Sequence, residues 1–289
     1  MVVAGLWLTW STAFIAIKIG LTLASPEVFA LLRVLAAIAA MGAVLLVLRL
    51  VQGRADSGPG LHRYAAVLGA TNVTGFLVFQ NLGMVDLQVG LSAVLIYTQP
   101  LLVAIGAQLF LRQRLTARRV VGLVCGWFGV LVVVSAEVGT GAAPLPAVLL
   151  LLAAALSWTV GTLVFSSVPA DVDLWPLLFW QNVYGVLPIA VLTLLRSGTV
   201  DWGGPLLASA AWAGIGASVG GFGLQFVLLR RGEASVVSSW IFAVPILAGG
   251  LGVLVLGDVL RPGLAVGAVL AAAGIYLVNT TARRKAVPV

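Results

Sequence analysis

The sequence predicts an all-α membrane protein, with ten transmembrane helices in two inverted five-helix repeats around a central cavity. Three observations predict this fold. The chain of 289 residues is 61% hydrophobic and only 9% charged, whereas a soluble domain is about one quarter charged. About ten apolar stretches reach the ~20 residues that span a bilayer. The second half of the chain also repeats a pattern of the first half.

The apolar stretches follow one another with short interruptions of charge, glycine or proline. The first has no charged leader and no small-residue cleavage site, so we interpret it as a retained helix rather than a signal peptide. The expected spans are 2–20, 27–50, 64–85, 89–111, 118–138, 145–167, 174–196, 204–229, 234–257 and 262–281.

The positive charges predict the orientation. The net charge is +7, and an excess of Lys and Arg marks cytoplasmic loops. With a cytoplasmic N-terminus, the outer side holds only Lys18, Arg196 and Arg261. The inner side then holds Arg49, Arg54, Arg63, Arg112, Arg114, Arg118, Arg119, Arg230, Arg231, Arg283, Arg284 and Lys285. We therefore expect a multi-pass protein of the bacterial inner membrane with both termini in the cytoplasm. The basic charge indicates no nucleic-acid partner.

Residues that recur at one fixed offset indicate a duplication. A shift of 145 residues aligns Gly69 with Gly214, Gln80 with Gln225 and Pro100 with Pro245 without a gap. Five spans per repeat force the second copy into the membrane upside down, and such inverted repeats place a binding site between them. We expect the first repeat at 1–140 and the second at 141–289. Pro100 and Pro245 are the predicted hinges, because proline within a helix produces a kink.

Several short motifs resemble the drug/metabolite transporter superfamily, and specifically its EamA-type exporters. They are WSTAFIAIK at 10–18, PEVFALLR at 26–33, TQP at 98–100, LRQRLT at 111–116 and GLVCGWFGVLVVV at 122–134. The aromatic residues on the polar helices look most like the bacterial exporters of aromatic amino acids. The resemblance implies export through a central cavity by alternating access. The chain departs from the family at Arg112-Gln113 and Gly257-Asp258, where family members usually have glycine and glutamate.

Polar and aromatic residues within the spans are the candidates for substrate binding, because an amide in hydrocarbon is costly unless it is satisfied. The alternative is that these residues join helices. Arg33 is a candidate counter-charge for a substrate carboxylate, or else a structural arginine that bonds backbone carbonyls. The substrate-binding candidates are Trp10, Asn72, Gln80, Tyr97, Gln99, Trp158, Gln181, Tyr184, Gln225 and Trp240.

All nine acidic residues fall in loops or at helix ends, so no carboxylate relay is expected in the membrane core. This favours a facilitator that exports small metabolites, with aromatic or other neutral amino acids as the expected cargo. A proton-coupled multidrug or other metabolite exporter, for which Glu27 and Asp86 are the nearest coupling candidates, is the alternative. Phosphorylated sugars would need more buried cations than Arg33.

We do not expect an enzyme, because the spans hold no carboxylate pair and no nucleophile beside a base. His62 and Cys125 have no companion ligands, so neither a metal nor a cofactor is expected. We expect a monomer whose partners are the lipid bilayer and a small molecule.

Overall fold

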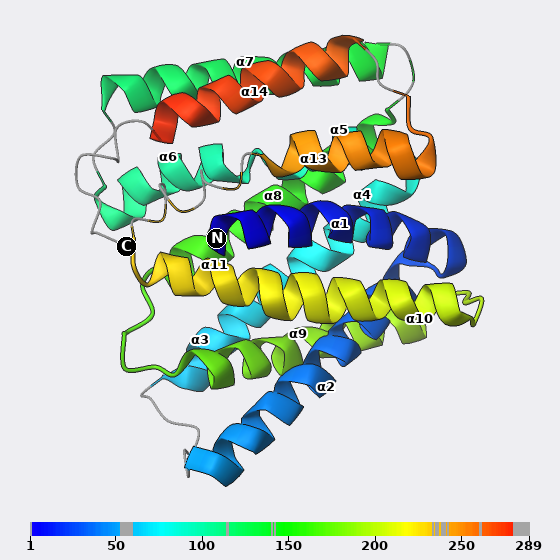
Figure 1. Ribbon diagram of the computed structural model, residues 1–289, viewed down its shortest axis with the longest axis vertical. Helices are drawn as coiled ribbons and strands as arrows, with labels where there is room; N and C mark the ends of the chain where they lie inside the picture. The colour runs from blue at the N-terminus through cyan, green and yellow to red at the C-terminus, as the bar shows by residue number, and fades with distance from the viewer. Residues whose placement is uncertain are drawn as a thin grey trace.

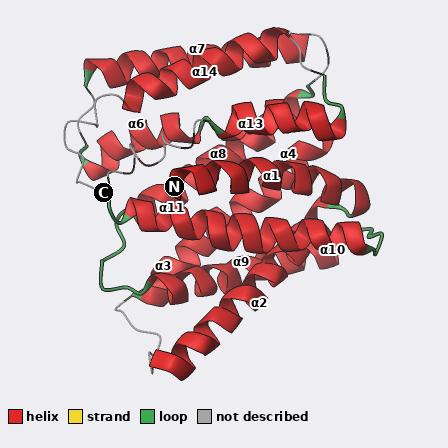
Figure 2. Ribbon diagram, in the orientation of Figure 1, coloured by secondary structure: helices red, strands yellow, loops and turns green. Residues whose placement is uncertain are grey.

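The structure is a computed structural model that describes residues 2–52, 60–113, 116–139, 141, 143–232, 234, 237, 241, 243–259 and 262–279. Every regular element in these ranges is a helix (Figure 2). Extended pairing within them is limited to one antiparallel bridge between Ala24 and Val200. The expectation of an all-α chain is therefore confirmed.

The first half of the chain forms helical segments that turn back on one another. Their bounds are α1 (Val2–Leu23), α2 (Pro26–Gln52), α3 (Leu61–Leu68), η1 (Gly69–Gly75), α4 (Phe76–Asp86), α5 (Val89–Ile96), α6 (Gln99–Leu111) and α7 (Ala117–Gly139). The elements α3, η1 and α4 follow without interruption and make one helix, in which η1 has the wider π-helical winding.

The second half is again a series of helical segments. Its elements are α8 (Leu145–Phe165), α9 (Leu174–Arg196), α10 (Gly204–Ala211), η2 (Trp212–Gly221), α11 (Phe222–Leu229), α13 (Val244–Leu251), η3 (Gly252–Leu256) and α14 (Pro262–Asn279). The elements α10, η2 and α11 again form one helix with a π-helical middle. Of the predicted span 234–257, the structure describes helix from Val244 onward.

Seven of the described helices are long and apolar enough to cross a membrane, and two shorter apolar helices, Val244–Leu256 and Ala265–Gly274, accompany them. Large apolar side chains lie exposed on the outside of the bundle, among them Leu50, Phe110, Leu194 and Leu254. An exposed apolar surface of this extent suits contact with lipid. The chain is therefore a multi-pass membrane protein.

The positions of Pro100 and Pro245 at helix starts explain how these prolines are tolerated. The chain leaves the helix at Tyr97 and Thr98, and α6 begins with Gln99 and Pro100. The amides of Leu101 and Leu102 donate to the Thr98 carbonyl. Pro100 thus stands in the first turn of a helix, where a missing N–H leaves no bond unmade. Pro245 has the same place in α13.

Glycines allow the π-helical segments to approach neighbouring helices closely. A Cβ on Gly69 would lie 2.6 Å from the carbonyl oxygen of Gln181 in α9. A Cβ on Gly214 would lie 2.3 Å from the carbonyl oxygen of Arg33 in α2. Both distances are too short for a real Cβ, so only glycine fits where these backbones cross.

The helices are arranged so that α7 and α14 lie side by side at one edge of the molecule (Figure 1). Next to them lie α5, α6 and α13, followed by α1, α4 and α8, while α2, α3 and α9 occupy the opposite edge (Figure 1). Helix α1 contacts α13, α10, η2, α4 and α5. The residues near the middle of α1 therefore face the interior of the bundle.

Polar bonds join several elements at the end of the bundle where α4 finishes. The ammonium of Lys18 donates to the carbonyls of Met84 at 2.7 Å and of Val85 and Leu87 at 2.9 Å. Asp258 accepts the N–H of Val89 at 2.9 Å. The last carbonyls of α4 and the first amide of α5 are thereby satisfied.

Candidate functional site

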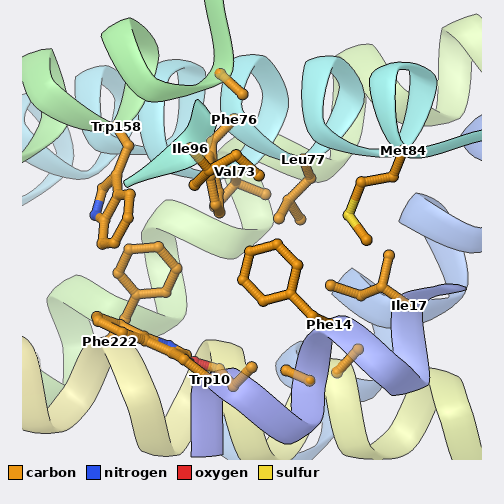
Figure 3. Packing of buried hydrophobic residues seen from close by; sticks show 14 of the residues in the cluster. Trp10, Phe14, Ile17, Val73, Phe76, Leu77, Met84, Ile96, Trp158 and Phe222 are labelled. Carbon is orange, nitrogen blue, oxygen red and sulfur yellow. The ribbon is translucent and has the colours of Figure 1, made fainter. Parts of the chain in front are cut away.

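Six aromatic side chains from different parts of the chain surround a small cavity in the middle of the bundle. Trp10 of α1 stands edge-on to Trp158 of α8, with ring centroids 5.2 Å apart. Tyr97 lies 5.7 Å and Phe76 5.4 Å from Trp158. Phe222 completes the group at 6.0 Å from Trp10. Figure 3 shows the rings of Trp10, Trp158 and Phe222 gathered on one side, with Phe14 farther along α1.

The spacing of residues along each helix explains this convergence. Trp10, Phe14 and Ile17 are separated by four and three positions, so they share one face of α1 and all line the cavity. Phe76 precedes Gln80 by one turn of α4 in the same way. Edge-on pairs of rings at these distances are mutually favourable, because the positive edge of one ring meets the negative face of the next.

Arg33 brings a charge to this apolar wall. Its side chain is 2% exposed and lies in α2, directed at η2 and α4. Its Nε donates to the Ala213 carbonyl at 3.1 Å and to the Ser218 hydroxyl at 3.3 Å. Its Nη1 donates to Oε1 of Gln80 at 3.1 Å. Arg33 therefore has both roles considered from the sequence: it bonds a backbone carbonyl, and it lines the cavity.

The cavity retains free hydrogen-bond donors. Within the described residues, the structure gives no hydrogen bond to Nη2 of Arg33, to Nε2 of Gln80 or to the hydroxyl of Tyr97. The first two groups can only donate, and the hydroxyl can donate or accept. A ligand with acceptor oxygens would find partners here.

The cavity is small in this conformation. Its volume is about 20 Å³, which is room for about one water molecule. The remaining lining residues are Ala13, Ile96 and Ala217. A metabolite of the size of an amino acid enters only if the surrounding helices or rings move apart.

The other predicted residues lie at various distances from this cavity. Gln225 reaches it indirectly, because its Oε1 accepts the indole N–H of Trp158 at 3.3 Å. Gln99 donates to Thr162 one turn farther along α8, at 3.0 Å. Asn72 is buried, and neither atom of its amide has a partner among the described residues.

Two of the substrate-binding candidates lie away from the cavity, and a third lies outside the described residues. Gln181 is buried where α9 meets η1, and its Oε1 lacks a partner within the described residues. The Tyr184 hydroxyl bonds Nδ1 of His62 at 3.1 Å, with the ring of Trp180 beside both. Trp240 lies outside the described residues.

Several lining residues were not among the predicted ones. Phe14, Phe76 and Phe222 form much of the wall, and Ser218 helps to hold Arg33. The helical period offers the signal that would have found the aromatic ones. Phe14 follows Trp10 by four positions, and Phe222 precedes Gln225 by three, so each shares a face with a predicted residue.

Acidic side chains do not line the cavity in the part of the chain that the structure describes. Glu27 is buried at the first turn of α2, with 6% of its side chain exposed. Asp86 and Asp258 are at the end of the bundle beside Lys18. The described residues hold no cluster of potential metal ligands.

Comparison with known proteins gives the class and then the family. The bundle resembles a protein of known crystal structure with a TM-score of 0.71 at 22% identity, over 98% of this chain and 96% of that one. The uncharacterized transporter YvbV of Bacillus subtilis is 28% identical over 98% of this chain and 92% of its own. A probable amino-acid metabolite efflux pump of Escherichia coli is 25% identical over 93% and 90%.

A helical bundle with an apolar outer surface and relatives of this kind define a membrane transporter rather than an enzyme. The model of the EamA-like transporter family matches residues 1–135 and again residues 145–280. The chain belongs to the EamA-like transporter family, as its resemblance to this family within the drug/metabolite transporter superfamily predicts.

Proposed function

We propose that this transporter exports small metabolites, with aromatic or other neutral amino acids as cargo, by alternating access through the cavity between Trp10, Tyr97 and Trp158. The observation that carries the proposal is a wall of aromatic rings next to unpaired donors on Arg33 and Gln80. Rings can stack on a planar side chain while the donors bind a carboxylate. The efflux function in the name of the Escherichia coli relative supports the same cargo.

The transporter would consist of ten helices in two inverted repeats, at 1–140 and 141–289. The two separate matches of the family model support this organisation. So do backbone features that recur 145 residues apart. Arg112 and Gly257 both have left-handed backbones, with φ of 55° and 70°. Thr98 and Ala243 both precede the helices that begin with the prolines.

The positive charges favour a cytoplasmic position for both termini in the inner membrane, as argued from the sequence. Lys18 and Asp258 would then lie at the outer end. Pro100 and Pro245 would mark hinges. At the first of them, helix α5 can change its angle to α6 without losing a hydrogen bond inside either helix. A monomer contains the complete cavity.

We expect a facilitator driven by the gradient of its cargo, because no acid lines the cavity within the described residues. A proton-coupled multidrug or other metabolite exporter is the second candidate. The burial of Glu27 favours it, since a carboxyl removed from water is a common site of proton binding in transporters.

Flux of radiolabelled aromatic amino acids into proteoliposomes tests these alternatives. The facilitator should give saturable flux down the cargo gradient, competed by other neutral amino acids and unchanged by a pH gradient. Flux that requires the pH gradient, is lost in Glu27→Gln and prefers a cationic dye would instead establish the second candidate.

A further inference from the structure

Arg33 is a buried charge that contacts no opposite charge among the residues that the structure describes. Its guanidinium bonds the Ala213 carbonyl, the Ser218 hydroxyl and the Gln80 amide, all of which are neutral. No charged side chain among the described residues acts on it. A charge removed from water is costly unless an opposite charge accompanies it. The empty cavity therefore carries a net charge of +1 that nothing on the described protein neutralises.

The net charge of the cargo determines the net charge of the cavity after binding. A carboxylate with no other charge neutralises Arg33, so that the loaded site has no net charge. A zwitterion also brings an ammonium, and the loaded site keeps its +1. The ammonium finds no carboxylate in the cavity lining, only ring faces and the oxygens of Gln80 and Tyr97.

We propose that the preferred cargo is an aromatic monoanion, with one carboxylate and no ammonium, and that its export is electrogenic. The inference rests on the proposed transport function and specifies the charge of the cargo. N-acylated aromatic amino acids and aryl carboxylates belong to this chemical class.

The membrane potential would then supply the driving force. The loaded transporter moves outward as a neutral unit, and the empty transporter returns with the positive charge of Arg33. One negative charge leaves the cell per cycle, which an inside-negative potential favours. This accounts for export without a carboxylate relay, because no ion has to accompany the cargo.

Three compounds with the same indole ring provide the test: N-acetyl-L-tryptophan with a net charge of −1, L-tryptophan as the zwitterion, and tryptamine with +1. Binding of each to the purified transporter is measured by competition with radiolabelled N-acetyl-L-tryptophan. We expect the monoanion to bind at least about tenfold more tightly than tryptophan, and tryptamine not to compete.

A potential imposed with potassium and valinomycin tests the charge movement. At a sustained, inside-positive 100 mV, N-acetyl-L-tryptophan should accumulate in proteoliposomes up to about 50-fold, whereas tryptophan should only equilibrate. Accumulation of the monoanion that is the same with and without the imposed potential would overturn the proposal.

Two variants at one position separate the charge from the packing. Gln80→Glu places a carboxylate at the position that Nη1 of Arg33 now contacts, and should abolish the preference for the monoanion. Gln80→Met has nearly the same size without a charge. It loses one donor for the carboxylate and should bind the monoanion and tryptophan more weakly, but the monoanion should still bind more tightly than tryptophan. A preference that survives in Gln80→Glu overturns the inference.

The unaltered transporter separates this inference from the proposed function. If tryptophan binds and is transported with no advantage for the monoanion, the inference is overturned and the proposed function stays intact. If none of the three compounds is transported, both are overturned.

Discussion

At the scale of single residues, the site depends on side chains that are held in place by their neighbours. Trp10 is an example, because its indole N–H donates to the Ala217 carbonyl at 3.3 Å while its ring faces the cavity. Gly221 leaves the space that this indole fills. A Cβ on Gly221 would lie 2.1 Å from Nε1 of Trp10.

Replacing Gly221 by alanine should displace Trp10 and weaken transport. We expect KM to rise by about tenfold, since a displacement of about 1 Å in a positioned group can cost up to a hundredfold. The measurement is concentration-dependent flux in proteoliposomes.

Gly220→Ala is the matched control, because its Cβ would meet only the Ile215 carbonyl at an ordinary 3.7 Å. The two variants should therefore differ. Equal KM values for Gly220→Ala and Gly221→Ala would show that the position of Trp10 does not matter for the cargo.

At the scale of elements, Lys18 ties the end of α4 to α1. Its three bonds satisfy carbonyls that the helix end leaves without partners. Lys18→Met keeps the apolar stem and removes the donors. We expect it to lower the free energy of unfolding by about 2 kcal/mol, because hydrogen bonds from charged groups contribute roughly 1.5–3 kcal/mol each when buried and less at a half-exposed site. Thermal unfolding in detergent measures the effect.

Thr22→Val provides the comparison for this experiment. Thr22 lies one turn beyond Lys18 on α1, and its hydroxyl bonds only the Ile19 carbonyl of the same helix. Its replacement should change the unfolding temperature little. If both variants have the same unfolding temperature as the unaltered protein, the bonds of Lys18 contribute nothing to stability.

The sequence predicted the bounds of the helices better than the π-helical segments and breaks within them. Apolar length predicted seven of the long helices with ends correct to a few residues, because burial in lipid requires an unbroken apolar run. It did not predict the π-helical winding at Gly69–Gly75 and Trp212–Gly221, the segments that contact α9 and α2. Pro100 was expected within a helix, whereas the break at Tyr97 and Thr98 places it at a helix start.

The sequence predicted the types of residue that form the candidate site, but only some of the individual residues. Trp10, Tyr97, Trp158, Gln80 and Arg33 lie together, as polar and aromatic residues inside apolar spans should. Asn72 and Gln181 are also amides inside apolar spans, but they lie at other contacts between helices. Residue type shows that a side chain avoids lipid, but the rotation of each helix determines which neighbour it meets.

At the scale of the whole molecule, the small volume of the cavity implies that transport requires a second arrangement of the helices. A cysteine at Ala13, which lines the cavity and is 3% exposed, should therefore react with a small charged thiol reagent only when the bundle opens. The reaction is measured in a Cys125→Ala background, since Cys125 is the single cysteine of the chain. Bound cargo should slow it at least severalfold.

Ala37→Cys in the same background is the control, because Ala37 is fully buried and does not line the cavity. It should stay unreactive. A cysteine at position 13 that is as inert as one at position 37, with and without cargo, would contradict alternating access through this cavity.

The short antiparallel pairing at Ala24 and Val200 affects how the protein is made. The amide of Ser25 donates to the Thr199 carbonyl at 2.9 Å, and that of Asp201 to the Leu23 carbonyl at 2.7 Å. These partners are far apart in the chain, so at ribosomal speeds of about 5–20 residues per second the turn after α1 waits on the order of ten seconds or more for its partner. During biogenesis the first helices are thus held in the bilayer by their own hydrophobicity, and this connection forms only after α9 has been inserted.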